Sequence, residues 1–419
     1  MADTPHPSPI PHARRLKIGF VGNTNNYPFL VATALHRMGH DVTVLLDRTE
    51  SLHRPEGRYP DLDLRAAHWI QDISGDVAID RWRPVRPAAL EARALRAFDL
   101  LVLNGYGPAL AGNHGVPAFA MLTGSDLTQL ANWSSLRVLW RDLSASLGAL
   151  RAALACLIHA RTIRLQRKAI ASAFGVSYFV RGIVPEGDRV LDSIGVRPQR
   201  RLSFMLSDID HIDSQRPPHG GPELRIFNVA RLNWRQPKPS HLSELDMKGT
   251  DILLQGFAAF RKRTGLPARL VLVRKGVDVG ATEQEVQRLG IADQVTWLSE
   301  MSQAQVFEQY ALADVVTEQL STSYVGMGGL DAMAAGRPVI ANTRRDTRVE
   351  GLLEDSPVLH ATTPREVCDH LEQLARSPQW RQQLGAVSRR YVEERHSPEA
   401  AARRIIDLHA RLGQRTEAA

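Results

Sequence analysis

Hydrophobic runs and helical spacings alternate through the first third of the chain. The run LKIGFVGN (16–23) predicts a buried strand that ends in a Gly/Asn loop. In the segment 28–39, apolar residues recur at 30, 31, 34, 35 and 38, which predicts a helix that Gly39 ends. HDVTVLLD (40–47), FDLLVLNG (98–105) and VPAFAML (116–122) predict further strands. Strand, loop, helix and strand in this order are typical of a βαβ unit in a parallel sheet.

The second half repeats this alternation. Strands are predicted within 224–232, 268–276, 295–300, 314–320 and 337–342, and helices within 249–265, 282–290, 302–313 and 326–336. Three further helices are expected at 364–375, 378–395 and 398–412. Both halves therefore predict α/β domains with doubly wound parallel sheets, which bind ligands at the carboxyl ends of their strands.

The pattern also suggests where the domains begin and end. A chain of 419 residues suits two domains of roughly 200 residues each. We expect a loose tail at 1–15, an N-terminal domain at 16–205 and a C-terminal domain at 206–395, because a polar Pro/Gly segment interrupts the periodicity near 200–222. Residues 396–419 are expected to form a helix that crosses back to the N-terminal domain, followed by a tail.

Composition narrows the class of protein. The net charge of +7 leaves three kinds of partner open: nucleic acid, anionic lipid and phosphate-bearing small molecules. No zinc motif, RNP-like strand or basic helix with interleaved aromatics is present, so nucleic acid is not expected. Two distant cysteines form no disulfide framework or metal motif. The chain shows no signal-peptide run and no stretch near the roughly 18 apolar residues of a membrane span. We expect a cytoplasmic protein.

Five pieces in register between Phe227 and Asn342 resemble the donor domain of glycosyltransferase family 4, the retaining GT-B enzymes. They include NVARLNW with MKGTDILLQGF, LGIADQVTWLSEMSQAQVFEQYALADVV, and GMGGLDAMAAGRPVIAN. The N-terminal half matches loosely, through its βαβ start and TGSDL (123–127). The resemblance implies two Rossmann-like domains facing across a cleft. It also implies a retaining transfer of a hexose from a nucleotide-diphosphate sugar to a glycan or lipid-linked acceptor, in cell-surface polysaccharide or glycolipid synthesis. No cofactor and no metal are implied.

The sequence departs from the family pattern at three places. The family carries two Glu residues separated by seven others, and here these positions hold Ser323 and Asp331. The segment EQLSTSYVG (318–326) resembles a branch with an acid-Gln-Leu run at this place. The histidine of the family's N-terminal domain falls near Thr123. The interval from Arg231 to Lys248 is longer than usual and is interpreted as a surface insertion.

Transfer from a nucleotide sugar leaves negative charge on the departing diphosphate, which fixed cations and helix N-termini stabilise. The resemblance assigns the catalytic cations to Arg231 and Lys248. Without it, both would be interpreted as ordinary surface residues near strand ends.

Donor binding is assigned to further residues of the second half. A glycine-opened helix brings backbone amides close to a ligand, and an acid in its first turns can accept the ribose hydroxyls. A plain turn and a helix-end acid are the alternative interpretations. The donor residues expected here are Gly326, Gly328, Gly329, Asp331, Ser323, Tyr324 and Lys275.

The N-terminal half offers a second, smaller set. Gly22 and Asn23 follow the first strand and are expected to face the donor, with turn chemistry as the alternative. Thr123, Ser125 and Asp126 in TGSDL are expected to bind sugar or acceptor hydroxyls, and Asp126 is alternatively the cap of the following helix.

The segment 134–173 is mostly helical and strongly basic. Arg161, Arg164 and Lys168 fall at i, i+3 and i+7 on one helical face, beside the apolar LGALRAALACLI (147–158). This pattern favours a helix that docks on anionic lipid at the inner face of the membrane. The alternative is a solvated basic face whose opposite side joins the core.

Three other functions stay open. A nucleotide-sugar 2-epimerase shares the fold but needs acid/base carboxylates and no acceptor. A non-catalytic family member would bind nucleotide sugar without turnover. A dinucleotide dehydrogenase is disfavoured because GFVGNTNN lacks the third glycine of that fingerprint.

Overall fold

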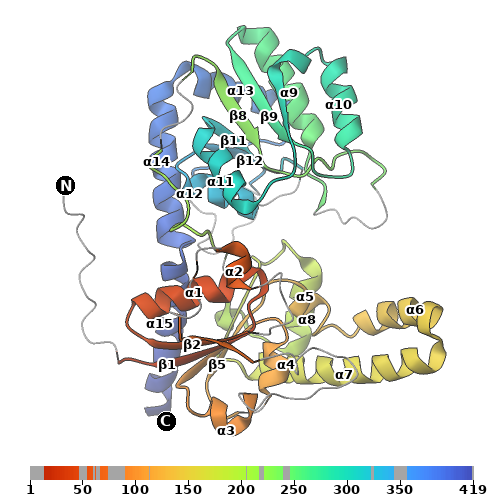
Figure 1. Ribbon diagram of the computed structural model, residues 1–419, viewed down its shortest axis with the longest axis vertical. Helices are drawn as coiled ribbons and strands as arrows, with labels where there is room; N and C mark the ends of the chain where they lie inside the picture. Colours follow the sequence, from red (N-terminus) through yellow and green to blue (C-terminus); the bar gives the residue numbers. More distant parts are fainter. Residues whose placement is uncertain are drawn as a thin grey trace. The chain divides into compact units, whose positions relative to one another are not determined.

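The computed structural model describes residues 14–46, 54–59, 62, 67–73, 90–112, 114–203, 205–216, 221–238, 246–321, 325–343 and 356–417. It divides into two compact units, coloured along the chain in Figure 1. Unit 1 contains Met1–Tyr178, Arg189–Leu202 and Ile405–Ala419, and unit 2 contains Phe179–Asp188 and Ser203–Arg404. Each unit is built on one sheet with helices, so the predicted pair of α/β domains with parallel sheets is confirmed.

The sheet of unit 1 has seven strands in the order β3-β2-β1-β4-β5-β6-β7, and its described pairings are parallel. The chain winds outward in one direction from β1 and in the other from β4, so the gap between these two strands is the switch point where such sheets bind ligands. The strands are β1 Lys17–Val21, β2 Asp41–Leu46, β3 Ile70–Asp72, β4 Leu100–Leu103, β5 Ala118–Met121, β6 Gly175–Tyr178 and β7 Arg201–Ser203.

The helices of unit 1 include the one that the first βαβ pattern predicts. In α1 the residues Leu30, Val31, Ala34 and Leu35 are buried, as the spacing of apolar positions requires. The helices are α1 Tyr27–Arg37, α2 Pro55–Arg58, α3 Ala92–Leu95, α4 Gly107–Ala111, α5 Ser125–Thr128, α6 Ser135–Leu147 and α7 Ala149–Ser172. Helix α8, Pro185–Ile194, has residues in both units.

Helices α6 and α7 form a hairpin that extends away from the sheet of unit 1 (Figure 1). Gly148, with φ 81°, separates them, a backbone conformation that glycine adopts without strain. Helix α6 has no buried residue, whereas α7 buries one face, including Ala152, Ile163 and Gln166. The opposite face of α7 is therefore left to solvent.

The sheet of unit 2 has six strands in the order β10-β9-β8-β11-β12-β13, again with parallel pairings and with its switch point between β8 and β11. The strands are β8 Leu224–Asn228, β9 Ala268–Val273, β10 Val295–Leu298, β11 Val315–Thr317, β12 Val339–Ala341 and β13 Leu359–His360. The helices are α9 Thr250–Thr264, α10 Val279–Arg288, α11 Gln303–Leu312, α12 Met327–Ala334, α13 Pro364–Arg376 and α14 Pro378–Arg395. Helix α15, Pro398–Glu417, has residues in both units.

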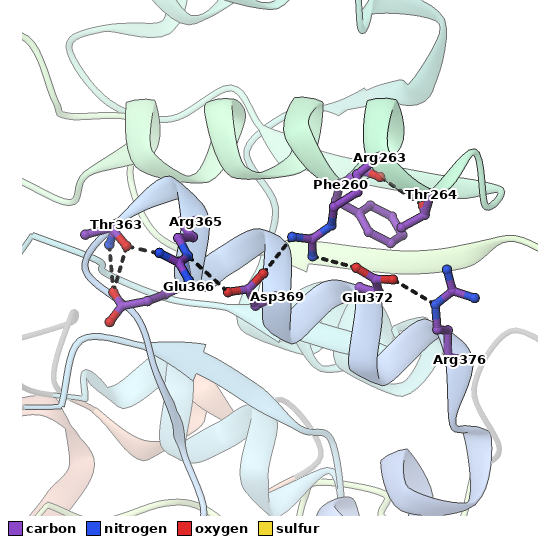
Figure 2. A network of polar contacts seen from close by, with 9 residues as sticks. All are labelled: Phe260, Arg263, Thr264, Thr363, Arg365, Glu366, Asp369, Glu372 and Arg376. Carbon is purple, nitrogen blue, oxygen red and sulfur yellow. Dashed lines mark hydrogen bonds and ion pairs between the residues drawn. The ribbon is translucent and has the colours of Figure 1, made fainter.

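Helices α9 and α13 pack closely on one face of this sheet. A Cβ added to Gly256 of α9 would lie 2.6 Å from Cβ of Val367, so glycine is what permits this approach. Beside this contact, Arg263 of α9 reaches Asp369 at 2.7 Å and Glu372 at 2.6 Å on α13 (Figure 2). These ion pairs are partly exposed and add little next to the buried apolar contact.

Candidate active site in the C-terminal unit

The switch point of unit 2 joins the two ends of the β8–α9 connection to the loop after β11 through backbone hydrogen bonds. The amide of Lys248 donates to the carbonyl of Asn233, 2.7 Å away, in the loop after β8. The amide of Leu320, after β11, donates to the carbonyl of Lys248 at 2.8 Å. Gly249 has φ +70° and its missing Cβ leaves room for the amide of Ser321. The start of α9 is thereby fixed against the carboxyl ends of β8 and β11.

The side chain of Lys248 is directed by a neutral partner. Its Nζ donates to Oε1 of Gln319 at 2.6 Å. Burial lowers the pKa of the Lys248 ammonium and the charge of Arg231 lowers it further, while the carboxylates of Glu318 and Asp246 act in the opposite direction. The structure thus brings Lys248 within electrostatic reach of Arg231, the other expected cation. Arg231 is exposed and, among the described residues, its guanidinium forms no ion pair.

Glu318 is a site residue that the sequence analysis did not select. It lies at the end of β11, is 7% exposed, and accepts a hydrogen bond from the amide of Gly326 at 2.9 Å. Burial raises the pKa of its carboxyl, which the amides of Gly326 and Gln319 and the charge of Lys248 oppose. The acid-Gln-Leu run was the signal that could have identified Glu318 and Gln319. Glu318 thus interacts electrostatically with Lys248, which precedes α9, and is hydrogen-bonded to the residue before α12.

The glycines that open α12 allow close packing. Gly326 precedes the helix, and a Cβ there would lie 2.7 Å from Oε1 of Glu318. A Cβ on Gly328 would lie 2.8 Å from Val229, and one on Gly329 would lie 2.6 Å from Val325. These glycines therefore bring the N-terminus of α12 against the ends of β8 and β11, where its amides give positive potential. Their contact with a donor stays a prediction.

Asp331 lies on α12 and is 4% exposed. Its Oδ1 accepts from Oγ of Ser207 at 2.7 Å, and its Oδ2 accepts from Nε2 of Gln303 at 3.4 Å. Tyr310 is buried, and its burial together with the charges of Asp331 and Glu318 raises the pKa of its phenol well above the ordinary value. The carboxylate is fixed by protein groups, and its role at a ribose stays a prediction.

Of the remaining donor candidates, Lys275 lies on a neighbouring loop and two fall outside the described residues. Lys275 follows β9, and its Nζ pairs with Glu300 at 3.1 Å with the side chain 46% exposed. Its backbone carbonyl accepts from the amide of Leu232, so the loop after β9 adjoins the loop after β8. Ser323 and Tyr324 lie outside the described residues.

In unit 1, the residues expected near the donor form a tight turn at the switch point. Gly22 has φ +91°, and a Cβ there would lie 2.2 Å from the carbonyl oxygen of Asn104. Asn23 is 4% exposed; its Oδ1 accepts from the amide of Phe29 at 2.9 Å and its Nδ2 donates to Asn26 at 2.7 Å. The side chain of Asn23 therefore fixes the start of α1, the turn chemistry that the sequence left as the alternative.

The TGSDL segment lies at the end of β5, beside the same switch point. Asp126 is 2% exposed and accepts from the amides of Thr123, at 2.9 Å, and Gly124, at 2.8 Å. Burial raises the pKa of Asp126 while these hydrogen bonds oppose the rise. Asp126 thus holds the residues before α5. Thr123 is half-buried and its hydroxyl donates to Oδ2 of Asp126 at 3.3 Å, whereas Ser125 is exposed; the binding of acceptor sugars by either residue stays a prediction.

Gln166 of α7 connects the basic hairpin to this edge. It is fully buried; its Nε2 donates to the carbonyls of Gly105 at 2.8 Å and Asp126 at 3.1 Å, and its Oε1 accepts from the amide of Ala109 at 2.9 Å. Three residues of α7, Arg161, Arg164 and Lys168, lie exposed on the opposite face.

Within the described ranges, no group of three or more His, Cys, Asp or Glu side chains is arranged to bind a metal ion. No helix in the part of the chain that the structure describes combines the length and apolarity of a membrane span.

Known proteins resemble this chain in sequence and fold. Residues 239–377 match the family model described as Glycosyl transferases group 1. Two curated relatives, each named D-inositol 3-phosphate glycosyltransferase, are 28% identical over 175 residues (Mycolicibacterium smegmatis) and 33% identical over 174 residues (Segniliparus rotundus). Each match covers 38% of this chain and 38% of the relative's own length.

The fold extends over nearly the whole molecule. The crystal structure of Anabaena Alr3699/HepE in complex with UDP and glucose aligns with a TM-score of 0.53 at 13% identity, over 97% of this chain and all of that one. Residues 239–377 of the C-terminal unit are therefore similar to the glycosyl transferases group 1 family, and the chain has the GT-B fold of two parallel-sheet α/β domains.

Proposed function

We propose that the chain is a glycosyltransferase that moves a hexose from a nucleotide-diphosphate sugar to an acceptor. The observation that carries this proposal is the position of Lys248. Its backbone is bonded to the loops after β8 and β11, and its ammonium is directed by Gln319 at the switch point of unit 2. A cation fixed at this edge of a doubly wound sheet suits a ligand with a diphosphate.

The proposed chemistry follows from the negative charge that develops on the departing diphosphate. Breaking the bond between the sugar carbon and the phosphate oxygen leaves negative charge on the diphosphate. Lys248 supplies a fixed positive charge, and Arg231 is exposed nearby and can grip phosphate oxygens in a bidentate manner. The start of α12 adds the positive end of a helix dipole. Lys248 and the start of α12 are held in place by hydrogen bonds before the bond breaks, and we propose that these charges act without a metal ion.

We propose retention of the anomeric configuration, as the family resemblance implies. In such a same-face substitution the leaving phosphate accepts the proton of the acceptor hydroxyl. Glu318 is buried and its carboxylate is bonded to the Gly326 amide, so it is assigned to positioning the loop and not to attack on the sugar.

Donor and acceptor are proposed from named relatives. Alr3699/HepE was crystallised with UDP and glucose, and the curated relatives are named as glycosyltransferases that act on D-inositol 3-phosphate. A nucleotide-diphosphate hexose and a glycan or lipid-linked hydroxyl acceptor, used in cell-surface polysaccharide or glycolipid synthesis, fit this set.

We propose a cytoplasmic enzyme that binds the inner face of the membrane through the hairpin of α6 and α7. Leu150, Leu154, Leu157, Arg161, Arg164 and Lys168 are spaced by three or four residues along one exposed face of α7. Leu150 is 86% exposed and Leu157 69% exposed, and an apolar stripe that continues into cations suits an anionic bilayer surface.

The experiment is an incubation with a panel of nucleotide sugars, each with and without candidate glycan and lipid-linked acceptors. The proposal expects donor consumption and a glycosylated product only when acceptor is present. Epimerised nucleotide sugar formed from donor alone would indicate the 2-epimerase instead. Donor binding without turnover across the panel would indicate a binding protein.

A further inference from the structure

Unit 1 contains a cavity of about 840 Å³ whose lining shares Lys168, and no other residue, with the sites described above. Its walls come from the residues before β5, the end of α7, the residues before β6 and β7, and the end of α15. This volume lies within the range of roughly 300–1,000 Å³ that ligand pockets occupy.

The cavity lies at the edge of the sheet opposite to the switch point. Val116 and Pro117 precede β5, and Phe174 precedes β6, so these lining residues mark the amino ends of parallel strands. Gly22, Asn104 and Thr123, in contrast, follow carboxyl ends. A ligand in this cavity is therefore held apart from the reaction edge of unit 1.

The charged groups of the cavity are all cationic. Lys168, Arg200 and Arg411 line it, and among its described lining residues none is acidic. Lys168 and Arg411 are exposed and make no ion pair with the described residues. Nε of Arg200 has no hydrogen-bond partner in the described part of the chain, although its Nη2 donates to the carbonyl of Ala171 at 2.8 Å. Three uncompensated cations favour an anion.

The rest of the lining is largely apolar. Leu165, Phe174, Leu408 and Leu412 lie beside the cations. Leu165 and Lys168 also continue the exposed stripe of α7, so apolar and cationic surface runs along this helix into the cavity. A free inorganic anion would leave this apolar wall in water, and a neutral apolar molecule would leave the cations without a partner.

We infer that this cavity is a binding site for an amphiphile that joins one anionic group, phosphate or carboxylate, to an apolar chain. The anionic group lies against Lys168, Arg200 and Arg411, and the chain lies against Phe174, Leu408 and Leu165. The site is separate from the proposed donor site, so the inference does not depend on the transfer reaction.

Calorimetric titration of the full chain with dodecyl phosphate, below its micelle-forming concentration, tests this inference. We expect one molecule to bind per chain, and dodecyl maltoside and inorganic phosphate to bind at least tenfold more weakly. The double variant Lys168→Glu/Arg411→Glu should weaken dodecyl phosphate binding at least tenfold. The matched control is Arg151→Glu/Arg403→Glu, which reverses two exposed charges on the same two helices outside the cavity and should bind within twofold of the unmodified chain.

Equal binding of dodecyl phosphate by the Lys168/Arg411 variant and the unmodified chain would overturn the inference. Dodecyl maltoside or inorganic phosphate binding as tightly as dodecyl phosphate would also overturn it, because one half of the site would then be unused. Where the inference holds, sedimentation with phosphatidic acid vesicles identifies the source of the amphiphile. Vesicle binding that is weakened by Arg411→Glu alone, at a cavity cation outside the stripe of α7, marks a bilayer lipid, and vesicle binding that this variant leaves unchanged marks a free amphiphile.

Discussion

The ammonium of Lys248 donates a 2.6 Å hydrogen bond to the side-chain carbonyl of Gln319, 71 residues further along the chain. This hydrogen bond to a neutral amide directs the ammonium, and the carboxylates of Glu318 and Asp246 favour its charged form. Because Gln319 follows β11 and Lys248 precedes α9, the contact exists only after the sheet of unit 2 has assembled. The cation proposed to hold the donor is thus placed by the fold.

Replacing Lys248 by Met should remove most of the transfer activity. The substitution keeps the length and apolar stem of the side chain and removes the charge, so we expect a loss of about 3 kcal/mol of transition-state stabilisation, roughly a hundredfold or more in kcat. Arg231→Met should act in the same way. Lys262→Met, at an exposed lysine of α9, is the matched control. Turnover of the Lys248 variant within threefold of this control would exclude Lys248 from the reaction.

Much of the framework around Lys248 could be predicted from the sequence. The predicted helix at 249–265 is α9, Thr250–Thr264, and the predicted helix at 326–336 is α12, Met327–Ala334. Both end or begin at glycine, and both carry apolar residues at helical spacing, so local pattern and fold agree. Short strands were harder to predict: β6 has four residues and β13 two, and their sheet partners, not their own pattern, determine them.

The contacts of the site could be predicted only in part. The strand order places the loops after β8 and β11 together, which follows from the doubly wound pattern. No local sequence pattern predicts the hydrogen bond between Ser207 and Asp331, because 124 residues separate them. Nor does the sequence show that Asp126 and Asn23 use their side chains on neighbouring amides, since either residue could instead face a ligand.

Donor binding should weaken as the pH rises above neutral, at pH values below those at which an ordinary lysine loses its proton. The pKa of Lys248 is lowered from 10.5 by burial, so a growing fraction is neutral as the pH rises toward that value, and the neutral amine does not attract diphosphate. We expect the Kd for the donor to rise between neutral pH and 10.5 in the unmodified protein. Calorimetry across this range measures the effect.

Two variants test whether Lys248 is the group whose loss of a proton raises the Kd. Lys248→Arg should show no rise in Kd, because guanidinium stays protonated. Glu318→Gln should move the rise to lower pH, because it removes a carboxylate that opposes the lowering of the Lys248 pKa. A rise of equal size in Lys248→Arg would assign the titration to another group.

Asp331→Asn should weaken nucleotide binding by about 1.5–3 kcal/mol, roughly tenfold or more, if the carboxylate accepts the ribose hydroxyls. The amide oxygen of Asn can still accept from Ser207, so the fold should persist. Calorimetry with the nucleoside diphosphate measures the effect, and Asp407→Asn, an exposed acid on α15, is the control. Equal affinities of the two variants would restrict Asp331 to a structural role.

Gly22→Ala should destabilise the protein more than Gly39→Ala does. Both glycines have φ near +90°, at +91° and +89°, so both variants incur the left-handed strain of about 1–2 kcal/mol. Only at Gly22 would the new Cβ also clash, 2.2 Å from the carbonyl of Asn104, and overpacking should add about 1–3 kcal/mol. The midpoints of urea unfolding of the two variants are compared, and a lower midpoint for Gly22→Ala measures the cost of the clash. Equal midpoints would show that the turn at Gly22 relaxes to accommodate the Cβ.

Membrane binding of the hairpin should depend on charge. Arg161→Gln/Arg164→Gln should lower partitioning to anionic vesicles by about 2 kcal/mol, roughly thirtyfold, at about 1 kcal/mol per basic residue. Arg390→Gln/Arg403→Gln, at exposed positions of α14 and α15, should leave partitioning unchanged. Sedimentation with phosphatidylserine vesicles measures both. Vesicle binding that does not depend on anionic lipid would contradict the proposed docking of the hairpin on the membrane.

The position of a bound diphosphate tests the account most directly. A thermal-shift screen selects the nucleotide sugar that stabilises the chain most, and a crystal structure with that molecule locates its phosphates. The account predicts phosphate oxygens within hydrogen-bonding distance of Nζ of Lys248 and of the guanidinium of Arg231, in front of the first turn of α12. Phosphates bound elsewhere, or no bound ligand at saturating concentration, would contradict it.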